Sequence, residues 1–395
     1  MKKKSKSAIL KQQIIKHLYF NQDLSCGDMA ADLDKSVPSI AKVLEELLAE
    51  GLIIGQGHAP SSGGRRPMVY SLKPDALYLL AVSMDQLSTR MNLVDLNGTS
   101  VTGIGLKELQ LHDNPGALTD LIKYIKAYLH TSGIAPTKIA GIGIGMPGFI
   151  NTKAGINHTY LATGGTSLTE YLTTQTGIKT YIDNDSSLIA LAEQRFGQAR
   201  EKKDVMVVNL GWGIGLGMIL DGTLYRGHTG FAGEFSHIPL YEEGELCSCG
   251  KKGCLEAEAS LLVVTKKAIA GIHAGGISSL IHIGNSSYEK AGDEVMNAAL
   301  QGDQYAIELY SDAGYKIGKA LSTLIHIMNP GTIILSGRGA RIARILMAPI
   351  QQAINKYCIP RLVEGTELLI SDLGPDAELT GAALLVMENF ELSAN

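Results

Sequence analysis

Two strand–turn–strand segments, more than a hundred residues apart, most strongly constrain the fold of this chain. They are LYLLAVSMDQLSTRMNLVDLNGTSV (77–101) and DVMVVNLGWGIGLGMILDG (204–222). Each pairs β-prone apolar runs across a tight turn. Buried strands and helices follow each one, including residues 139–150 and 179–197 after the first and 330–354 after the second. The repetition predicts a duplicated α/β body, in which two lobes enclose a cleft.

The length of 395 residues is enough for two or three domains. We expect a first domain over 1–75, one lobe of the body over 77–198 and a second lobe over 199–395, with the C-terminal helix returning to the first lobe. The five cysteines are too few for a disulfide scaffold. Neither a signal peptide nor an 18-residue apolar run is present. The sequence therefore predicts a cytoplasmic protein with no membrane partner.

The first 75 residues carry a helical pattern followed by a hairpin. Apolar residues recur at helical spacing over 8–20, a second short helix follows Ser25, and KSVPSIAKVLEELLAEGLI (35–53) predicts a third helix with Ser36 as its cap. Two β-prone runs, 52–54 and 68–72, then flank a Gly/Ser-rich loop. Three helices and a hairpin of this kind predict a winged helix-turn-helix.

This domain is also more basic than the rest of the chain, with 11 Lys and Arg against 8 Asp and Glu in a protein whose net charge is −4. A helix-turn-helix places its last helix in the major groove, and a basic loop suits phosphates or a narrow minor groove. The predicted contacts to operator DNA are Lys35, Ser36, Ser39, Lys42, Arg65 and Arg66. A small helical module for protein interaction is the alternative.

Three of the five cysteines crowd into CSCGKKGC (247–254). Together with His237 they form the pattern H-x9-C-x-C-x4-C, from Cys247, Cys249 and Cys254. One histidine and three thiolates make a closed four-coordinate set, which suits a structural Zn²⁺ and leaves no open position for catalysis. A redox pair or three incidental thiols are the alternatives, although redox pairs are more often C-x-x-C.

The segments GHTGFAGEFSHIPL (227–240) and CSCGKKGCLE (247–256) resemble the ROK family of sugar kinases and sugar-responsive repressors, which belongs to the actin-like ATPase superfamily with its duplicated ribonuclease H-like lobes. The resemblance covers about residues 77–390. A winged helix followed by such a body is similar to the family's transcriptional repressors, such as those of xylose and N-acetylglucosamine genes. The resemblance also implies zinc at the cysteine cluster.

The resemblance implies a sugar site in the cleft. In the family's kinases the residue matching Asp185 is the general base, so Asp185 would have that role if this chain were a kinase. His237 would serve both zinc and sugar. A helix N-cap is the alternative role for Asn184 and Asp185, and a solvated charge is the alternative for Glu256. The residues implied to bind sugar are Asn184, Asp185, Glu234, His237 and Glu256.

Both turns that bind ATP phosphates in the family's kinases are altered here. The first has two glycines in the kinases but contains Leu87 and Ser88 in this chain, and the second has Trp212 in place of a threonine. Because phosphates need a closely approaching backbone, ATP binding is not expected. We therefore predict no catalytic residue.

The predicted function is a DNA-binding regulator, a repressor, of carbohydrate-utilisation genes. Its expected partners are operator DNA, a sugar or sugar-phosphate effector, and a second copy in a homodimer or dimer of dimers. One alternative is an ATP-dependent sugar kinase with an N-terminal regulatory module. Another is a scaffold whose body binds a protein partner in place of sugar.

Overall fold

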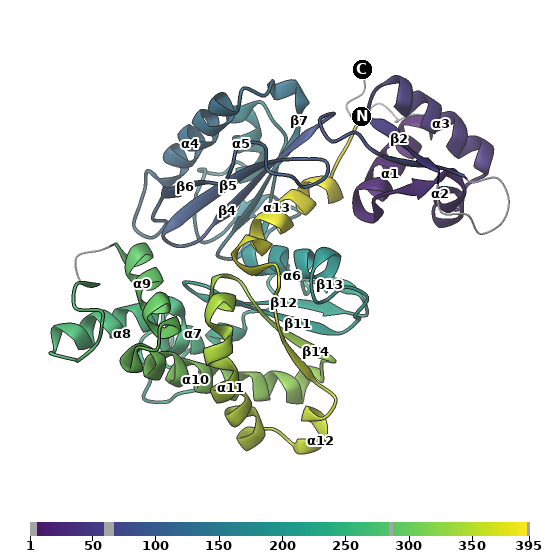
Figure 1. Cartoon of the computed structure of the whole chain (residues 1–395). Helices are drawn as coiled ribbons and strands as arrows, with labels where there is room; N and C mark the ends of the chain where they lie inside the picture. Colours follow the sequence, from purple (N-terminus) through teal and green to yellow (C-terminus); the bar gives the residue numbers. More distant parts are fainter. Residues whose placement is uncertain (1–5, 59–66, 284–286, 393–395) are drawn as a thin grey trace.

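The computed structural model describes residues 6–58, 67–283 and 287–392. These form a small N-terminal domain and a body built on two five-stranded sheets (Figure 1). None of the helices within these ranges is long and apolar enough to cross a membrane.

The N-terminal domain has three helices and a three-stranded sheet of order β1-β3-β2, as predicted for a winged helix-turn-helix. Ser25 caps the second helix in a capping box with Asp28. Ser36 occupies the predicted N-cap position of the third helix but makes no side-chain cap, and its hydroxyl donates to the Ser39 hydroxyl at 3.0 Å. The elements are α1 (Lys6–Asn21), β1 (Leu24–Ser25), α2 (Cys26–Asp32), α3 (Val37–Ala49), β2 (Ile53–His58) and β3 (Met68–Leu72).

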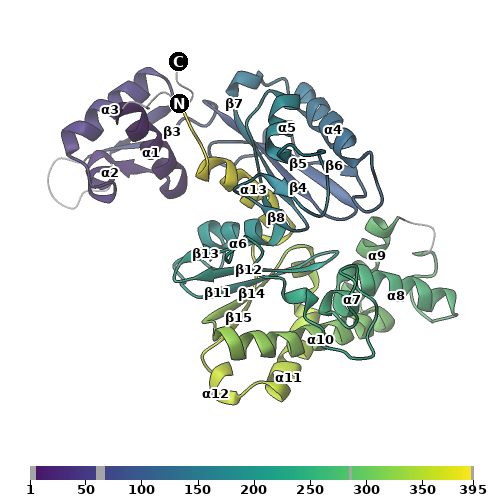
Figure 2. The same ribbon diagram turned by 180° about the vertical axis from the view of Figure 1, so that it is seen from behind.

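The first body sheet has the strand order β10-β7-β4-β5-β6. Strands β4, β5 and β6 are antiparallel neighbours, whereas β4, β7 and β10 run parallel. Helices α4 and α5 pack on this lobe (Figures 1 and 2). Its elements are β4 (Tyr78–Met84), β5 (Ser88–Asp95), β6 (Gly105–Glu108), α4 (Ala117–Ser132), η1 (Pro136–Lys138), β7 (Ile139–Met146), β8 (Ile150–Asn151), β9 (Ile156–Asn157), α5 (Leu168–Thr176) and β10 (Thr180–Asn184).

The second sheet, of order β13-β12-β11-β14-β15, repeats the same topology. Strands β11, β12 and β13 are antiparallel, and β11, β14 and β15 are parallel. The predicted duplication is therefore confirmed at the level of strand pairing. The elements are β11 (Val205–Leu210), β12 (Ile214–Leu220), β13 (Thr223–Tyr225), η2 (Phe235–His237), α7 (Leu255–Ala259), α8 (Leu261–His273), α9 (Tyr288–Leu300), α10 (Gln304–Met328), β14 (Thr332–Ser336), η4 (Arg338–Ile342), α11 (Ala343–Tyr357), α12 (Pro360–Val363), β15 (Glu367–Ile370) and η5 (Gly374–Asp376).

Two helices, α6 (Asp185–Phe196) and α13 (Ala377–Glu388), pack against each other between the sheets (Figures 1 and 2). Helix α13 lies on β4 and β7, and α6 contacts β11 and β12. We keep 77–198 and 199–395 as our proposal for the two lobes, with α6 and α13 as the helices that join them.

Glycines in the strands allow this close packing. A Cβ at Gly143 of β7 would lie 1.9 Å from the Ala382 carbonyl oxygen of α13. A Cβ at Gly217 of β12 would lie 2.5 Å from the Ser186 carbonyl oxygen of α6. Both distances are shorter than a carbon–oxygen contact permits. The repeated glycines of GIGIG and GIGLG thus bring a helix backbone onto each strand.

Candidate functional site

A cavity of about 440 Å³ is lined by residues of both lobes, and all five predicted sugar-binding residues line it. They come from separate elements: the β10–α6 junction, the two ends of η2, and helix α7. Pro147 and Gly148 line the cavity as well. The strand pairing therefore brings together residues that lie up to 72 positions apart, from Asn184 to Glu256.

Asn184 and Asp185 lie where β10 ends and α6 begins. Asn184 is the N-cap, and its Oδ1 accepts hydrogen bonds from the N–H groups of Ser186 and Ser187 at 3.0 and 3.2 Å. The alternative role as a helix cap is therefore real for Asn184, although the residue also lines the cavity. Its capping fixes the start of α6 and with it the position of Asp185.

Asp185 is held by donors on two elements. Its Oδ1 accepts from the Ser186 N–H at 2.7 Å and from the Ser186 hydroxyl at 3.1 Å, and its Oδ2 accepts from the Asn209 amide at 3.3 Å. Burial raises the pKa of Asp185 to about 6, and the negative charges of Glu256 and Asp85 contribute to the increase. A carboxylate held in this way is a well-positioned acceptor for a sugar hydroxyl.

Glu234 and Glu256 line the cavity with the predicted metal ligand His237. Glu234 Oε2 lies 3.7 Å from His237 Nε2, and burial raises the pKa of Glu234. Glu256 Oε2 accepts a hydrogen bond from the Ile214 N–H at 3.3 Å and from the Ser236 hydroxyl at 3.5 Å. Glu256 is thus tied to the second glycine turn, which differs from the solvated charge of the alternative interpretation.

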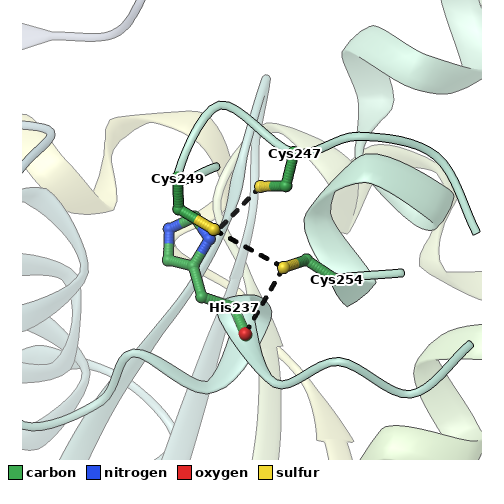
Figure 3. A group of neighbouring side chains, drawn as sticks. All are labelled: His237, Cys247, Cys249 and Cys254. Carbon is green, nitrogen blue, oxygen red and sulfur yellow. Dashed lines mark hydrogen bonds between the residues drawn. The ribbon is translucent and has the colours of Figure 1, made fainter. Parts of the chain in front are cut away.

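His237 and the three cysteines form one cluster, whose ligand atoms all lie within 4.8 Å of one another (Figure 3). His237 Nδ1 is 3.5 Å from Cys247 Sγ, and the sulfurs of Cys249 and Cys254 are 3.6 Å apart. Tetrahedral zinc with ordinary Zn–S and Zn–N bonds places its ligands about 3.5–3.8 Å from one another. The donor set and its spacing therefore fit a zinc ion.

The loop that carries the cysteines is folded tightly by two glycines. Gly250 and Gly253 have φ values of +84° and +72°. A Cβ at Gly253 would lie 1.7 Å from the Tyr241 carbonyl oxygen, so no other residue fits there. Since Nδ1 of His237 faces the sulfurs and Nε2 faces Glu234, the histidine joins this loop to the cavity.

The first altered glycine turn binds its own aspartate. Asp85 Oδ1 accepts from the N–H groups of Leu87 and Ser88 at 2.8 and 2.7 Å. The Leu87 side chain packs against the hydrophobic core of the second lobe. The turn thus contacts the opposite lobe through an apolar side chain.

The second altered turn carries Trp212, whose position in a charged cluster was not predicted from the sequence. Trp212 is only 2% exposed, and its indole N–H donates to Glu289 at 3.1 Å. The guanidinium of Arg338 lies 5.0 Å from the Trp212 ring and pairs with Glu289 and Asp293. Arg338 also lies 4.0 Å from Asp85 of the first lobe. One signal for Arg338 was present: it follows Gly337 directly after strand β14, at the carboxyl end where α/β proteins bind ligands.

Glu378 of α13 is a second cavity residue that the sequence analysis missed. Its Oε2 accepts from the Ser83 hydroxyl at 2.6 Å, and its Oε1 is buried without a hydrogen-bond partner among the described residues. Burial raises the pKa of Glu378 to about 8, and the charge of Asp185 adds to the shift. Glu378 therefore places a carboxyl that holds its proton at neutral pH beside Asp185.

The predicted DNA contacts lie at the start of α3 where the structure describes them. Lys35, Ser36, Ser39 and Lys42 are all exposed, whereas the opposite face of α3 is buried. Arg65 and Arg66 lie outside the described residues. The described part of the predicted surface is thus free for contact with DNA.

Comparison with known proteins places these features in a family. The sequence profile of the ROK family matches residues 93–389. The xylose repressor of Caldicellulosiruptor bescii is 25% identical over 96% of this chain and 96% of its own length. A glucokinase of Halalkalibacterium halodurans is 32% identical, over 63% of this chain and 77% of its own length.

A crystal structure of a ROK family transcriptional regulator, described as a homologue of the Escherichia coli MLC protein, has the same fold. Its TM-score is 0.76 at 24% identity, and the match covers 97% of this chain and 96% of that one. The expected fold, a winged helix joined to a two-lobed actin-like body, is thereby confirmed. With its cysteine cluster, its two-lobed cavity and a profile match over most of its length, the chain belongs to the ROK family.

Proposed function

We propose that the protein is a cytoplasmic DNA-binding repressor of carbohydrate-utilisation genes, controlled by a sugar or sugar phosphate bound in the cavity between its lobes. One observation carries this proposal. A single chain that aligns with a xylose repressor over nearly its whole length joins an exposed helix-turn-helix surface to a carboxylate-lined cavity. The site residues are those predicted: Asn184, Asp185, Glu234, His237 and Glu256 for sugar, and Lys35, Ser36, Ser39, Lys42, Arg65 and Arg66 for DNA.

In this proposal zinc is held by His237, Cys247, Cys249 and Cys254. Bound there, it supplies a rigid cross-link of the loop and fixes the ring of His237. The chain's own contribution is the second nitrogen of that ring, which faces the cavity beside Glu234. His237 then donates to a sugar hydroxyl, while the carboxylates of Asp185 and Glu256 accept from others.

Helix α6 offers a direct mechanical link between sugar and DNA. Its first turn holds Asp185, and Arg195 in its last turn lies 4.7 Å from the ring of Phe20 in α1. A second contact comes from α13, since Lys16 of α1 donates to the Glu388 carbonyl at 2.6 Å. If sugar closes the lobes around the cavity, both helices move relative to the DNA-binding domain. In a homodimer this changes the spacing of the two recognition helices, and operator affinity falls.

The experiment that tests the proposal begins with DNA fragments retained by the purified protein. One retained fragment serves in a gel-shift titration against a panel of sugars. Release of the fragment by at least one sugar is the expected result. Failure to retain specific DNA, or retention that no sugar alters, would contradict the proposal.

An ATP-dependent sugar kinase is the second candidate, because Asp185 is retained with a pKa of about 6 and a glucokinase is among the relatives. Leu87, Trp212 and Arg338 weigh against it. They fill the region of the two altered turns with side chains and with an internal ion-pair cluster. Sugar-dependent release of ADP from ATP distinguishes the two functions.

A further inference from the structure

The charged side chains of the cavity are predominantly acidic. Two arginines and two histidines line it, and each already has a polar partner. Arg90 donates to the Pro375 carbonyl at 2.6 Å and to Asp376 at 3.1 Å, and Arg338 pairs with Glu289 and Asp293. Of the histidines, His112 lies 3.2 Å from Asp113, and His237 belongs to the cysteine cluster. Against these stand five carboxyl groups, those of Asp85, Asp185, Glu234, Glu256 and Glu378. Because Glu378 holds its proton at neutral pH, the negative charge of the wall comes from the other four.

Three backbone donors in and beside the two glycine turns are bonded to carboxylates of the chain itself. The N–H groups of Leu87 and Ser88 point to Asp85, and the N–H of Ile214 points to Glu256. A Cβ at Gly213 would come within 2.7 Å of Glu256 Oε2, so the carboxylate lies directly against the turn. These are the groups with which such turns bind phosphate. In this chain the carboxylates of Asp85 and Glu256 accept these hydrogen bonds in place of a phosphate.

This distribution of donors and acceptors selects between two kinds of effector. Sugar hydroxyls donate hydrogen bonds, so they match a wall of carboxylates. A phosphate ester carries about −1.5 to −2 charges at pH 7 and offers only acceptors. We infer that the cavity recognises its effector as an uncharged, unphosphorylated sugar and rejects the corresponding sugar phosphate. The inference rests on the proposed function and narrows it, because the sequence alone left both kinds of effector open.

The test compares matched pairs on the full-length, zinc-loaded protein. Calorimetric titrations use glucose and glucose 6-phosphate, N-acetylglucosamine and its 6-phosphate, and xylose and xylose 5-phosphate. We expect the sugar that binds to do so at least about tenfold more tightly than its phosphate, since like charges repel strongly in a partly buried cavity. Equal or tighter binding of the phosphate would overturn the inference and leave the proposed function intact. Binding of neither member of any pair would overturn both.

Charge-removing variants locate the effect. Asp185→Asn and Asp85→Asn each remove one negative charge from the wall, so the ratio of the two dissociation constants should fall by about threefold or more. The ratio is the readout because either substitution also alters sugar affinity itself. Glu364→Gln is the matched control, since Glu364 is exposed and lies outside the cavity. If the ratio stays at the wild-type value in both cavity variants, the preference for sugar over sugar phosphate does not arise from the negative charges of the wall.

Discussion

Replacing Glu378 by glutamine should make the protein less sensitive to alkaline pH. The carboxyl of Glu378 is buried between α13 and β4, with one oxygen bonded to the Ser83 hydroxyl and the other without a partner among the described residues. Burial and the nearby charge of Asp185 raise its pKa from 4.5 to about 8. Because the folded protein holds this proton more tightly than the unfolded chain, the resulting stability is complete below about pH 4.5. It is lost as the pH rises towards 8.

The magnitude follows from the shift. A change from 4.5 to about 8 corresponds to a ceiling of about 5 kcal/mol in the free energy of unfolding, at about 1.4 kcal/mol for each pH unit. The titrations of Asp185 and Glu378 are coupled, so part of the shift belongs to the pair and not to Glu378 alone. We therefore expect the free energy of unfolding to change by about 2–5 kcal/mol. In Glu378→Gln the amide resembles the protonated acid and does not titrate. The variant should therefore keep this stability at pH 8.5, where the wild type has lost it.

The assay is thermal unfolding of the wild type and Glu378→Gln in matched buffers from about pH 5 to pH 8.5. Between about pH 5 and pH 8.5 the expected difference is about 2–4 kcal/mol, because part of the change lies below pH 5, and it corresponds to a divergence of roughly 4–8 °C in the melting temperatures. Glu364→Gln, at an exposed carboxylate, controls for the general loss of a charge. Parallel pH profiles for the wild type and Glu378→Gln would refute the buried, protonated state of Glu378.

Three further predictions concern zinc, coupling and catalysis. Cys249→Ser should lower the bound zinc content and weaken sugar binding about tenfold, because the metal fixes His237. If sugar-induced DNA release were unchanged after zinc loss, the cysteine cluster would only stabilise its own loop and would have no role in sugar recognition. Arg195→Ala should leave sugar binding and DNA binding intact but diminish sugar-induced DNA release by up to about fivefold, because the free energy of an exposed cation–π contact corresponds to about that factor. The control Arg200→Ala, at an exposed arginine, should leave sugar-induced release unchanged. The wild type should release no sugar-dependent ADP because Trp212 occupies the second turn. Release that Asp185→Asn abolishes would instead establish a kinase.

The parts of the fold and site that could be predicted were those with a local signature. The strand–turn–strand repeats lie within single segments, and the sheet topology follows them. Cys247, Cys249 and Cys254 lie within eight residues, so their spacing alone indicated a metal, and the structure brings His237 to them. For the sugar residues the family resemblance supplied the candidates.

The cluster of Trp212, Glu289 and Arg338 could not be predicted in the same way. Its members come from β12's leading turn, α9 and η4, and no spacing along the chain relates them. Trp212 was recognised only as the loss of a threonine. The structure adds that the indole N–H is satisfied by a carboxylate, which an arginine then neutralises. A buried aromatic donor of this kind requires a partner, but its identity is set by packing alone.

Glu378 illustrates a further limit, and it bears on how the lobes communicate. In the sequence it is an ordinary helical glutamate near the C-terminus, yet α13 returns to the first sheet and places it beside Asp185. Along helix α6, about 15 Å separates Asp185 from Arg195 in the last turn, where Arg195 meets the DNA-binding domain. Helices α6 and α13 pack backbone to backbone, since a Cβ at Gly381 would lie 2.1 Å from the Leu188 carbonyl oxygen, and we therefore expect them to move together. On this reasoning, a ligand that displaces either carboxyl should act on both contacts with the DNA-binding domain at once.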